Sequence, residues 1–247
     1  MSLAVVVYVP EGIIMASDSR QTLEVEARTP EGESYKVETV GSDYLTKTFL
    51  LEEQRVGVSH FGDTMLGGVT MASHIKRFAS EQVNEGDDVE VIASRLLKYF
   101  RGLFPDADAG FHVAGYREEG RRVVPHVYYC HVGDNVRERT NLEDGEIVYG
   151  ATWSGATEII ESIINPVVVE EEHGQEKVVR EPASISWETM TVQDAIDFAI
   201  YAIRTTIDTM RFQAVPKTVG GPIDILLLTP DSEPRWIQKK DYQGERV

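Results

Sequence analysis

Two short apolar runs near the start of the chain predict a β-hairpin. Leu3 to Tyr8 and Ile13 to Ser17 are rich in β-branched residues, and Pro10-Glu11-Gly12 between them is typical of a turn. Chain termini normally fray, so a buried strand that begins at the terminus is unusual. Such a strand would fix the position of an α-amino group at residue 2, which favours a functional interpretation.

The next segments alternate between polar stretches and further β-rich runs. Residues 23–43 are polar and acidic and predict a long exposed hairpin or loop. Beyond them, the apolar runs predict strands over Leu45 to Leu51, Arg55 to Ser59, Phe111 to Tyr116, Val123 to Val132, Ile147 to Tyr149, Ile223 to Thr229 and Arg235 to Gln238.

Four segments have apolar residues at helical spacing. The first is expected to begin at Asp63 or Thr64 and to end near Glu81, and the second begins at Asp87 or Asp88. The third covers about Gly155 to Ile164, and the fourth follows a capping-box-like start at Thr191 to Asp194. Residues 166–188 between them carry a valine run and an acidic run, and predict an insertion in the form of a small hairpin.

The order of elements is strands, two helices, strands, two helices, strands. This order differs from the strict alternation of a parallel doubly wound fold. It favours an α+β fold with two antiparallel sheets between two helical layers, a four-layer αββα sandwich. No repeat or long linker divides the chain, so we expect one domain over residues 1–247 with insertions at 23–43 and 166–188.

The composition of the chain argues against nucleic-acid-binding and membrane proteins. The chain has 24 basic and 41 acidic residues and a net charge of −17, which disfavours general binding to nucleic acid or to anionic membranes. No run approaches the roughly 20 apolar residues of a membrane span. The first residues lack a basic signal region, so we expect a cytoplasmic protein whose mature chain begins at or next to residue 1. Cys130 is the single cysteine and is interpreted as a core thiol in a reducing compartment.

Neither a metal site nor a phosphate loop is indicated. The six histidines show no metal-ligand spacing. The glycines at positions 62, 67 and 68 are not followed by the Gly-Lys-Ser/Thr sequence of a phosphate loop. We therefore expect neither a metal nor an organic cofactor.

One candidate group for catalysis consists of Ser2, Asp18 and Lys47. A serine hydroxyl is a weak nucleophile that needs a base, and a free α-amino group on the same residue can supply one. A nearby lysine would lower the pKa of that amine by like-charge repulsion, and an aspartate would hold the lysine charged and oriented. From the pattern alone, however, Lys47 between Thr46 and Thr48 is more typical of a solvated strand residue.

The start of the chain resembles the start of proteasome β subunits and their bacterial relatives, which are N-terminal-nucleophile hydrolases. The similar residues are 2–7 and the stretch Glu11 to Arg20. The register has no gap and places the family nucleophile at Ser2, the acidic partner at Asp18, and the arginine at Arg20. The family lysine falls on Lys47, after a hairpin that is longer here. The family nucleophile is threonine, whereas this chain has serine, which keeps the hydroxyl chemistry.

Further similarity extends over about 230 residues. Gly57 to Asp63 resembles the family's strand and Gly-Asp turn, which places an oxyanion-hole N–H at about Ser59. Tyr149 to Gly155 resembles the family's Gly-Ser-Gly turn and assigns a supporting serine to Ser154. Residues 208–210 and 219–224 resemble the bacterial Anbu-type branch. The classical aspartate aligns with Met210, and Asp208 is its nearest substitute, with the Thr218 hydroxyl as another.

The resemblance implies a peptidase that acts on peptides or unfolded proteins. Ser2 would attack the carbonyl, its own amine would act as general base, and Arg20 would hold Asp18. The resemblance also implies a homo-oligomeric ring or an open spiral, with an ATPase as a conceivable partner. Two alternatives stay open, namely a non-catalytic assembly subunit and an N-terminal-nucleophile amidase that acts on small molecules.

Overall fold

The structure is a computed structural model that describes the chain apart from residues 1, 30–31, 166, 172–174, 181–182 and 242–247. Side chains are described outside residues 166–182. Within this part of the chain, two five-stranded antiparallel sheets and four α-helices form a mixed α and β structure. No described helix is both long enough and apolar enough to span a membrane.

The first sheet contains the amino-terminal strand. Its strands, in spatial order, are β14 (Gly150–Gly155), β1 (Leu3–Val9), β2 (Gly12–Ser17), β17 (Asp224–Leu228) and β18 (Arg235–Gln238). The second sheet has the order β11 (Val136–Arg139), β10 (Arg122–His131), β9 (Ala109–Glu119), β6 (Val56–Gly62) and β5 (Thr48–Leu51).

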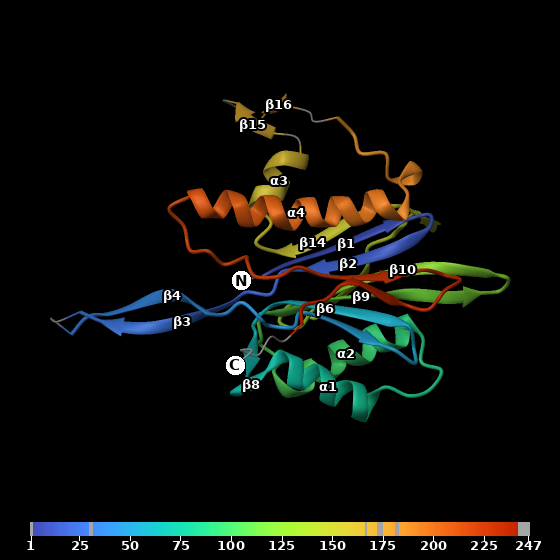
Figure 1. The fold of residues 1–247 in the computed structure, drawn as a ribbon, viewed down its shortest axis with the longest axis horizontal. Coiled ribbons are helices and arrows are strands. Elements are labelled where there is room, and N and C mark those ends of the chain that lie inside the picture. The colour runs from blue at the N-terminus through green and yellow to red at the C-terminus, as the bar shows by residue number, and fades with distance from the viewer. Residues whose placement is uncertain (1, 30–31, 166, 172–174, 181–182, 242–247) are drawn as a thin grey trace, which may run out of the picture.

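The helices cover the outer faces of the two sheets. Figure 1 shows α4 (Val192–Phe212) over the sheet that contains β1, with α3 (Glu158–Ile164) beside it. In the same view α1 (Met71–Gln82) and α2 (Val89–Leu103) lie under the sheet that contains β6. A short 3₁₀ helix, Trp187–Thr189, precedes α4.

The alternation of β1 explains why both of its faces are buried. Leu3, Val5 and Val7 pack in the cluster beneath α4. Val6 and Tyr8 point the other way, into the apolar layer between the two sheets. Gly57 on β6 allows the sheets to come this close, because a Cβ atom there would lie 2.2 Å from the Met15 sulfur.

Four two-stranded hairpins complete the described structure. They are β3 (Gln21–Arg28) with β4 (Ser34–Ser42), β7 (Met65–Leu66) with β8 (Val69–Thr70), β12 (Leu142–Glu143) with β13 (Glu146–Ile147), and β15 (Val167–Glu171) with β16 (Gln175–Arg180). The first and last of these confirm that residues 23–43 and 166–188 contain hairpins. Figure 1 shows β3 and β4 projecting from the body of the molecule.

Two predicted elements have different bounds in the structure. The first helix begins at Met71 rather than near Asp63, because the β7–β8 hairpin intervenes and Thr70 caps the helix by accepting from the Ser73 N–H at 3.3 Å. The strand expected over Ile147 to Tyr149 is present only in part, because β13 ends at Ile147 and the strand that pairs with β1 begins at Gly150. The predicted capping box at Thr191 and Asp194 is present.

Candidate active site

A fully buried carboxylate, that of Asp18, lies directly after β2. Its Oδ1 accepts from the Lys47 ammonium at 2.6 Å and from the Leu3 N–H at 3.0 Å. Its Oδ2 accepts from the N–H groups of Arg20 at 3.1 Å and Gly220 at 3.0 Å. A buried charge needs such partners to be tolerated. Asp18 therefore ties together the start of the chain, the lysine and the segment after α4.

Lys47 is fully buried, in a segment without regular secondary structure immediately before β5. Its carbonyl accepts from the His60 N–H at 2.9 Å, which holds the segment against β6. Burial lowers the pKa of Lys47, and the Asp18 carboxylate opposes that shift. The interpretation of Lys47 as a solvated strand residue is wrong, because Asp18 compensates its charge inside the protein.

Residue 2 is held in place from two sides. The Ser2 carbonyl accepts from the Ala156 N–H at 2.8 Å, and the following N–H, that of Leu3, donates to Asp18. Gly155 has φ +104°, and a Cβ atom there would lie 1.7 Å from the Ser2 carbonyl oxygen, so only glycine allows this approach. The Ser2 hydroxyl is buried and has no hydrogen-bond partner within the described part of the chain. An unpaired buried hydroxyl is costly, and such groups are often functional.

A chain of three buried hydroxyls links the two sheets beside Lys47. The hydroxyl oxygens of Ser17 and Thr48 are 2.8 Å apart, and those of Thr48 and Ser59 are 2.9 Å apart. Ser17 belongs to the first sheet, whereas Thr48 and Ser59 belong to the second. The hydroxyl chain therefore fixes how the sheets meet at the end where Asp18 lies.

The assignment of an oxyanion-hole N–H to about Ser59 stays a prediction. Ser59 lies inside β6, opposite Thr48 of β5 on one side and His112 of β9 on the other. The side chain of Ser59 reaches the vicinity of the site through the hydroxyl chain.

Ser154 is near residue 2, as expected. It lies in β14 directly opposite Ala4, and its neighbour Gly155 lies opposite Leu3. Its side chain is buried. Side chains that lie directly opposite each other on neighbouring strands point to the same face of the sheet, so Ser154 is on the same face as Ala4. Among the predicted supporting residues, Ser154 is the one that lies on β14.

Arg20 contacts Asp18 through its backbone N–H, whereas its guanidinium binds a different carboxylate. The guanidinium forms a bidentate pair with Asp43, with Nε to Oδ1 at 2.6 Å and Nη2 to Oδ2 at 2.9 Å. The pair raises the pKa of Arg20 and lowers that of Asp43. The planar guanidinium matches a carboxylate in this geometry, and Asp43 follows directly after β4. Arg20 and Asp43 therefore close the base of the β3–β4 hairpin, and only the backbone of Arg20 reaches Asp18.

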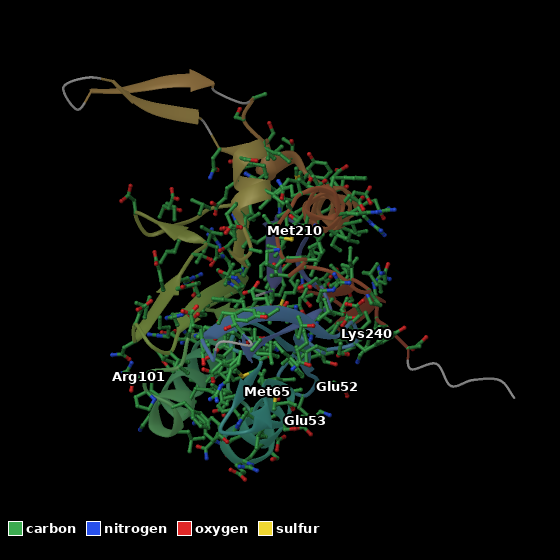
Figure 2. The ribbon with its side chains drawn as sticks, turned by 90° about the vertical axis from the view of Figure 1, so that its left-hand side faces the viewer. Glu52, Glu53, Met65, Arg101, Met210 and Lys240 are labelled. Carbon is green, nitrogen blue, oxygen red and sulfur yellow. The ribbon has the colours of Figure 1, made fainter. Side chains whose placement is uncertain are left out.

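Asp208 is not brought to this group. It is exposed on α4, whereas Met210 is buried on the face that packs on the first sheet (Figure 2). Residues two apart in a helix point in nearly opposite directions, so both side chains cannot face the site. The Thr218 hydroxyl lies 3.8 Å from the Met210 sulfur.

Two buried groups near Lys47 were missed by the sequence analysis. His60 is fully buried, and burial together with the charge of Lys47 lowers its pKa to about 3, so it is neutral at ordinary pH. Asp224, at the start of β17, forms a buried ion pair with Lys240. Asp224 belongs to the stretch 219–224 that carries the resemblance to Anbu, but no sequence pattern indicated Lys240 as its partner. No group of three or more histidine, cysteine, aspartate or glutamate residues suited to a metal ion occurs in the described part of the chain.

The comparisons with known proteins give a structural relative. No family model matches the chain, and no curated protein matches its sequence. Among solved structures, the chain is similar to the Anbu (Gly-1) mutant from Hyphomicrobium sp. strain MC1, with a TM-score of 0.59 and 14% identity. The match covers 98% of this chain and 89% of the other. At this identity the match shows a shared fold, and it confirms the resemblance to Anbu at that level.

Proposed function

We propose that the protein is a proteasome-like peptidase in which Ser2 is the nucleophile. The observation that carries this proposal is the fixed position of residue 2. The Ser2 hydroxyl is buried with no hydrogen-bond partner among the described residues, and the adjacent Leu3 N–H donates to Asp18 of the buried Asp18–Lys47 pair. The fold shared with Anbu supports it. We also propose that the sheets and helices form the four-layer αββα sandwich of N-terminal-nucleophile hydrolases, as one domain over residues 1–247.

In the proposed mechanism, removal of the residue before Ser2 leaves a free α-amine on the nucleophile. The hydroxyl oxygen attacks a peptide carbonyl, and the amine takes the hydroxyl proton. Lys47 lowers the pKa of the amine by repulsion and is itself held by Asp18. The protonated amine then gives its proton to the leaving amine, and water hydrolyses the acyl-enzyme. Ser154, which lies opposite Ala4 in the neighbouring strand, orients the amine.

Substrate and assembly follow from the same resemblance. We propose peptides or unfolded proteins as substrates, and a homo-oligomeric ring or open spiral as the assembled form. An ATPase partner belongs to the same proposal. The cytoplasm is its proposed location, and no metal or organic cofactor has a step in the mechanism.

Intact mass spectrometry with an electrophilic peptide inhibitor tests the nucleophile. The expected result is a chain without Met1 that gains one inhibitor mass, located on residue 2 by fragmentation. Ser2→Ala should take up no label, and Lys47→Met should label at least 100-fold more slowly. Lys76→Met is the matched control, because Lys76 is exposed on α1, and it should label like the unmodified sequence. A chain that lacks Met1, takes up no label and cleaves no member of a peptide panel would refute the proposal.

The second candidate is a non-catalytic assembly subunit. The observation that favours it is the complete burial of Ser2, together with serine in place of the family threonine. It predicts an assembled, unlabelled protein in which Lys47→Met changes stability and nothing else. Turnover of small amides without turnover of peptides would instead indicate the amidase alternative.

A further inference from the structure

A second buried ion pair lies beside the Asp18–Lys47 pair. Asp224 is opposite Ser17 in the pairing of β17 with β2, so it is one position from Asp18 along the strand. The Lys240 N–H donates to the Asp224 Oδ1 at 2.9 Å, and the Lys240 ammonium contacts Oδ2. The two side chains are 5% and 1% exposed. Figure 2 shows Lys240 close to the end of the described chain.

The two pairs are linked through Ser17, which lies opposite Asp224 and whose hydroxyl oxygen is 2.8 Å from that of Thr48, the residue after Lys47. Burial lowers the pKa of Lys47, Asp18 opposes the shift, and the charge of Lys240 lowers the pKa further. The charge of Arg20 acts in the same direction as that of Lys240. His60, which also lies near Lys47, is neutral. Lys47 is therefore a buried cation with two other cations in its neighbourhood.

The acidic groups around Lys47 have partners of their own. Asp43, whose pKa is affected by Lys47, is held by the guanidinium of Arg20. Asp224 is held by both the backbone and the ammonium of Lys240. A buried carboxylate without a partner would attract any cation within reach, because leaving it unpaired is costly. Of the three carboxylates, those of Asp43 and Asp224 are already paired with other cations, so the Asp18 carboxylate is the one that pairs with Lys47.

We propose that Lys240 is a positioning residue of the candidate active site. By occupying Asp224, it keeps the Lys47 ammonium on Asp18 and so keeps it beside residue 2. The inference rests on the proposed function for its catalytic meaning, whereas the arrangement of charges can be tested without any activity. It gives the segment after β18 a part in the site that the resemblance to proteasome subunits does not assign.

The direct test is the titration of Lys47, followed by NMR in protein labelled with ¹³C at the lysine ε-carbons. The signal of Lys47 is assigned by its loss in Lys47→Met. In Lys240→Met the pKa of Lys47 should rise by about one unit, a tenfold change in its protonation equilibrium, because a cation is lost and the Asp224 carboxylate is uncovered. In Asp224→Asn/Lys240→Met the rise should be smaller, because the competing carboxylate is also removed. Lys239→Met is the control, since Lys239 lies over the Trp236 ring at 4.4 Å, and it should leave Lys47 unchanged.

Inhibitor labelling of Ser2 gives a second readout. Lys240→Met should label about tenfold more slowly, and Asp224→Asn/Lys240→Met should recover most of the rate, which a purely structural role would not produce. An unchanged pKa of Lys47 in Lys240→Met, or a double variant that labels no faster than the single one, would overturn the proposal. If Lys240→Met does not fold, the double variant Asp224→Asn/Lys240→Met is compared with the unmodified sequence. A rise in the pKa of Lys47 supports the proposal, and an unchanged pKa overturns it. If the unmodified sequence lacks Met1, takes up no label and cleaves no peptide, the proposed function fails, and the titration still tests the charge arrangement.

Discussion

Acid should destabilise this protein through histidines that are buried without a charge. His112 lies on β9 between the two sheets, fully buried, and neither ring nitrogen has a hydrogen-bond partner within the described residues. Its ring packs 5.3 Å from the Phe61 ring and 6.0 Å from the Tyr129 ring. Burial lowers its pKa from 6.5 to about 3. Replacement of His112 by phenylalanine removes the titrating group and breaks no hydrogen bond of the ring.

The magnitude follows from the two pKa values. Below about pH 6.5 the unfolded chain takes up a proton at this histidine, whereas the folded protein does so only near pH 3. The free energy of unfolding therefore falls as the pH falls between these values, by about 1.4 kcal/mol per pH unit. Because pH 5 lies about 1.5 units below 6.5, His112 should lower stability there by about 2 kcal/mol relative to neutral pH.

Urea unfolding at pH 7, 6 and 5, followed by circular dichroism, measures this loss. His112→Phe should lose about 2 kcal/mol less than the unmodified sequence between pH 7 and pH 5. Tyr129→Phe is the matched control, because it changes a neighbouring ring and keeps the histidine, so its pH dependence should be unaltered. If His112→Phe and the unmodified sequence show the same pH dependence, His112 is not a buried neutral group and the reasoning is wrong.

Three other experiments, two with substitutions and one with a thiol reagent, test separate parts of the structure. Gly155→Ala should cost more than about 1 kcal/mol and slow labelling of Ser2, measured by urea unfolding and mass spectrometry, because its Cβ atom meets the Ser2 carbonyl. Cys130, whose pKa burial raises to about 12, should not react with an aryl disulfide at pH 8 until urea unfolds the protein. Asp43→Asn should cost about 1 kcal/mol or less, but speed hydrogen exchange in β3 and β4, because Arg20 loses its charged partner at their base. Slow exchange there would show that other contacts hold the hairpin.

Much of the fold was predictable because periodicity is a local property. The buried run of β1 and the capping box of α4 are visible in the residues themselves, and both occur in the structure. The start of α1 was not predictable in the same way. Asp63 and Thr64 look like capping residues, but a short hairpin follows them, and the cap is Thr70. Several polar residues in a row offer equivalent caps, and tertiary packing selects one of them.

The candidate site depended on partners that are distant along the chain. The resemblance placed Asp18 and Lys47 together, and the structure brings them into contact. It did not reveal that Arg20 would pair with Asp43, because that partner comes from the returning strand of a hairpin that is longer here. The buried face of α4 contains Met210, and Asp208 lies on the exposed face. The spacing of the two residues alone did not indicate which of them would be buried.

The four hydrogen bonds of Asp18 have a consequence for when the site can exist. Its partners Leu3, Lys47 and Gly220 are separated from it by 15, 29 and 202 residues. Contacts between distant segments form late, because closing long loops costs entropy before the contact stabilises them. The last of these donors becomes available only after the ribosome has passed Gly220, 202 residues beyond Asp18. The hydrogen bonds around the Asp18 carboxylate are therefore complete only once the segment that contains Gly220 has folded back against the end of β2, and a nascent chain that stops before this segment lacks one of the four donors.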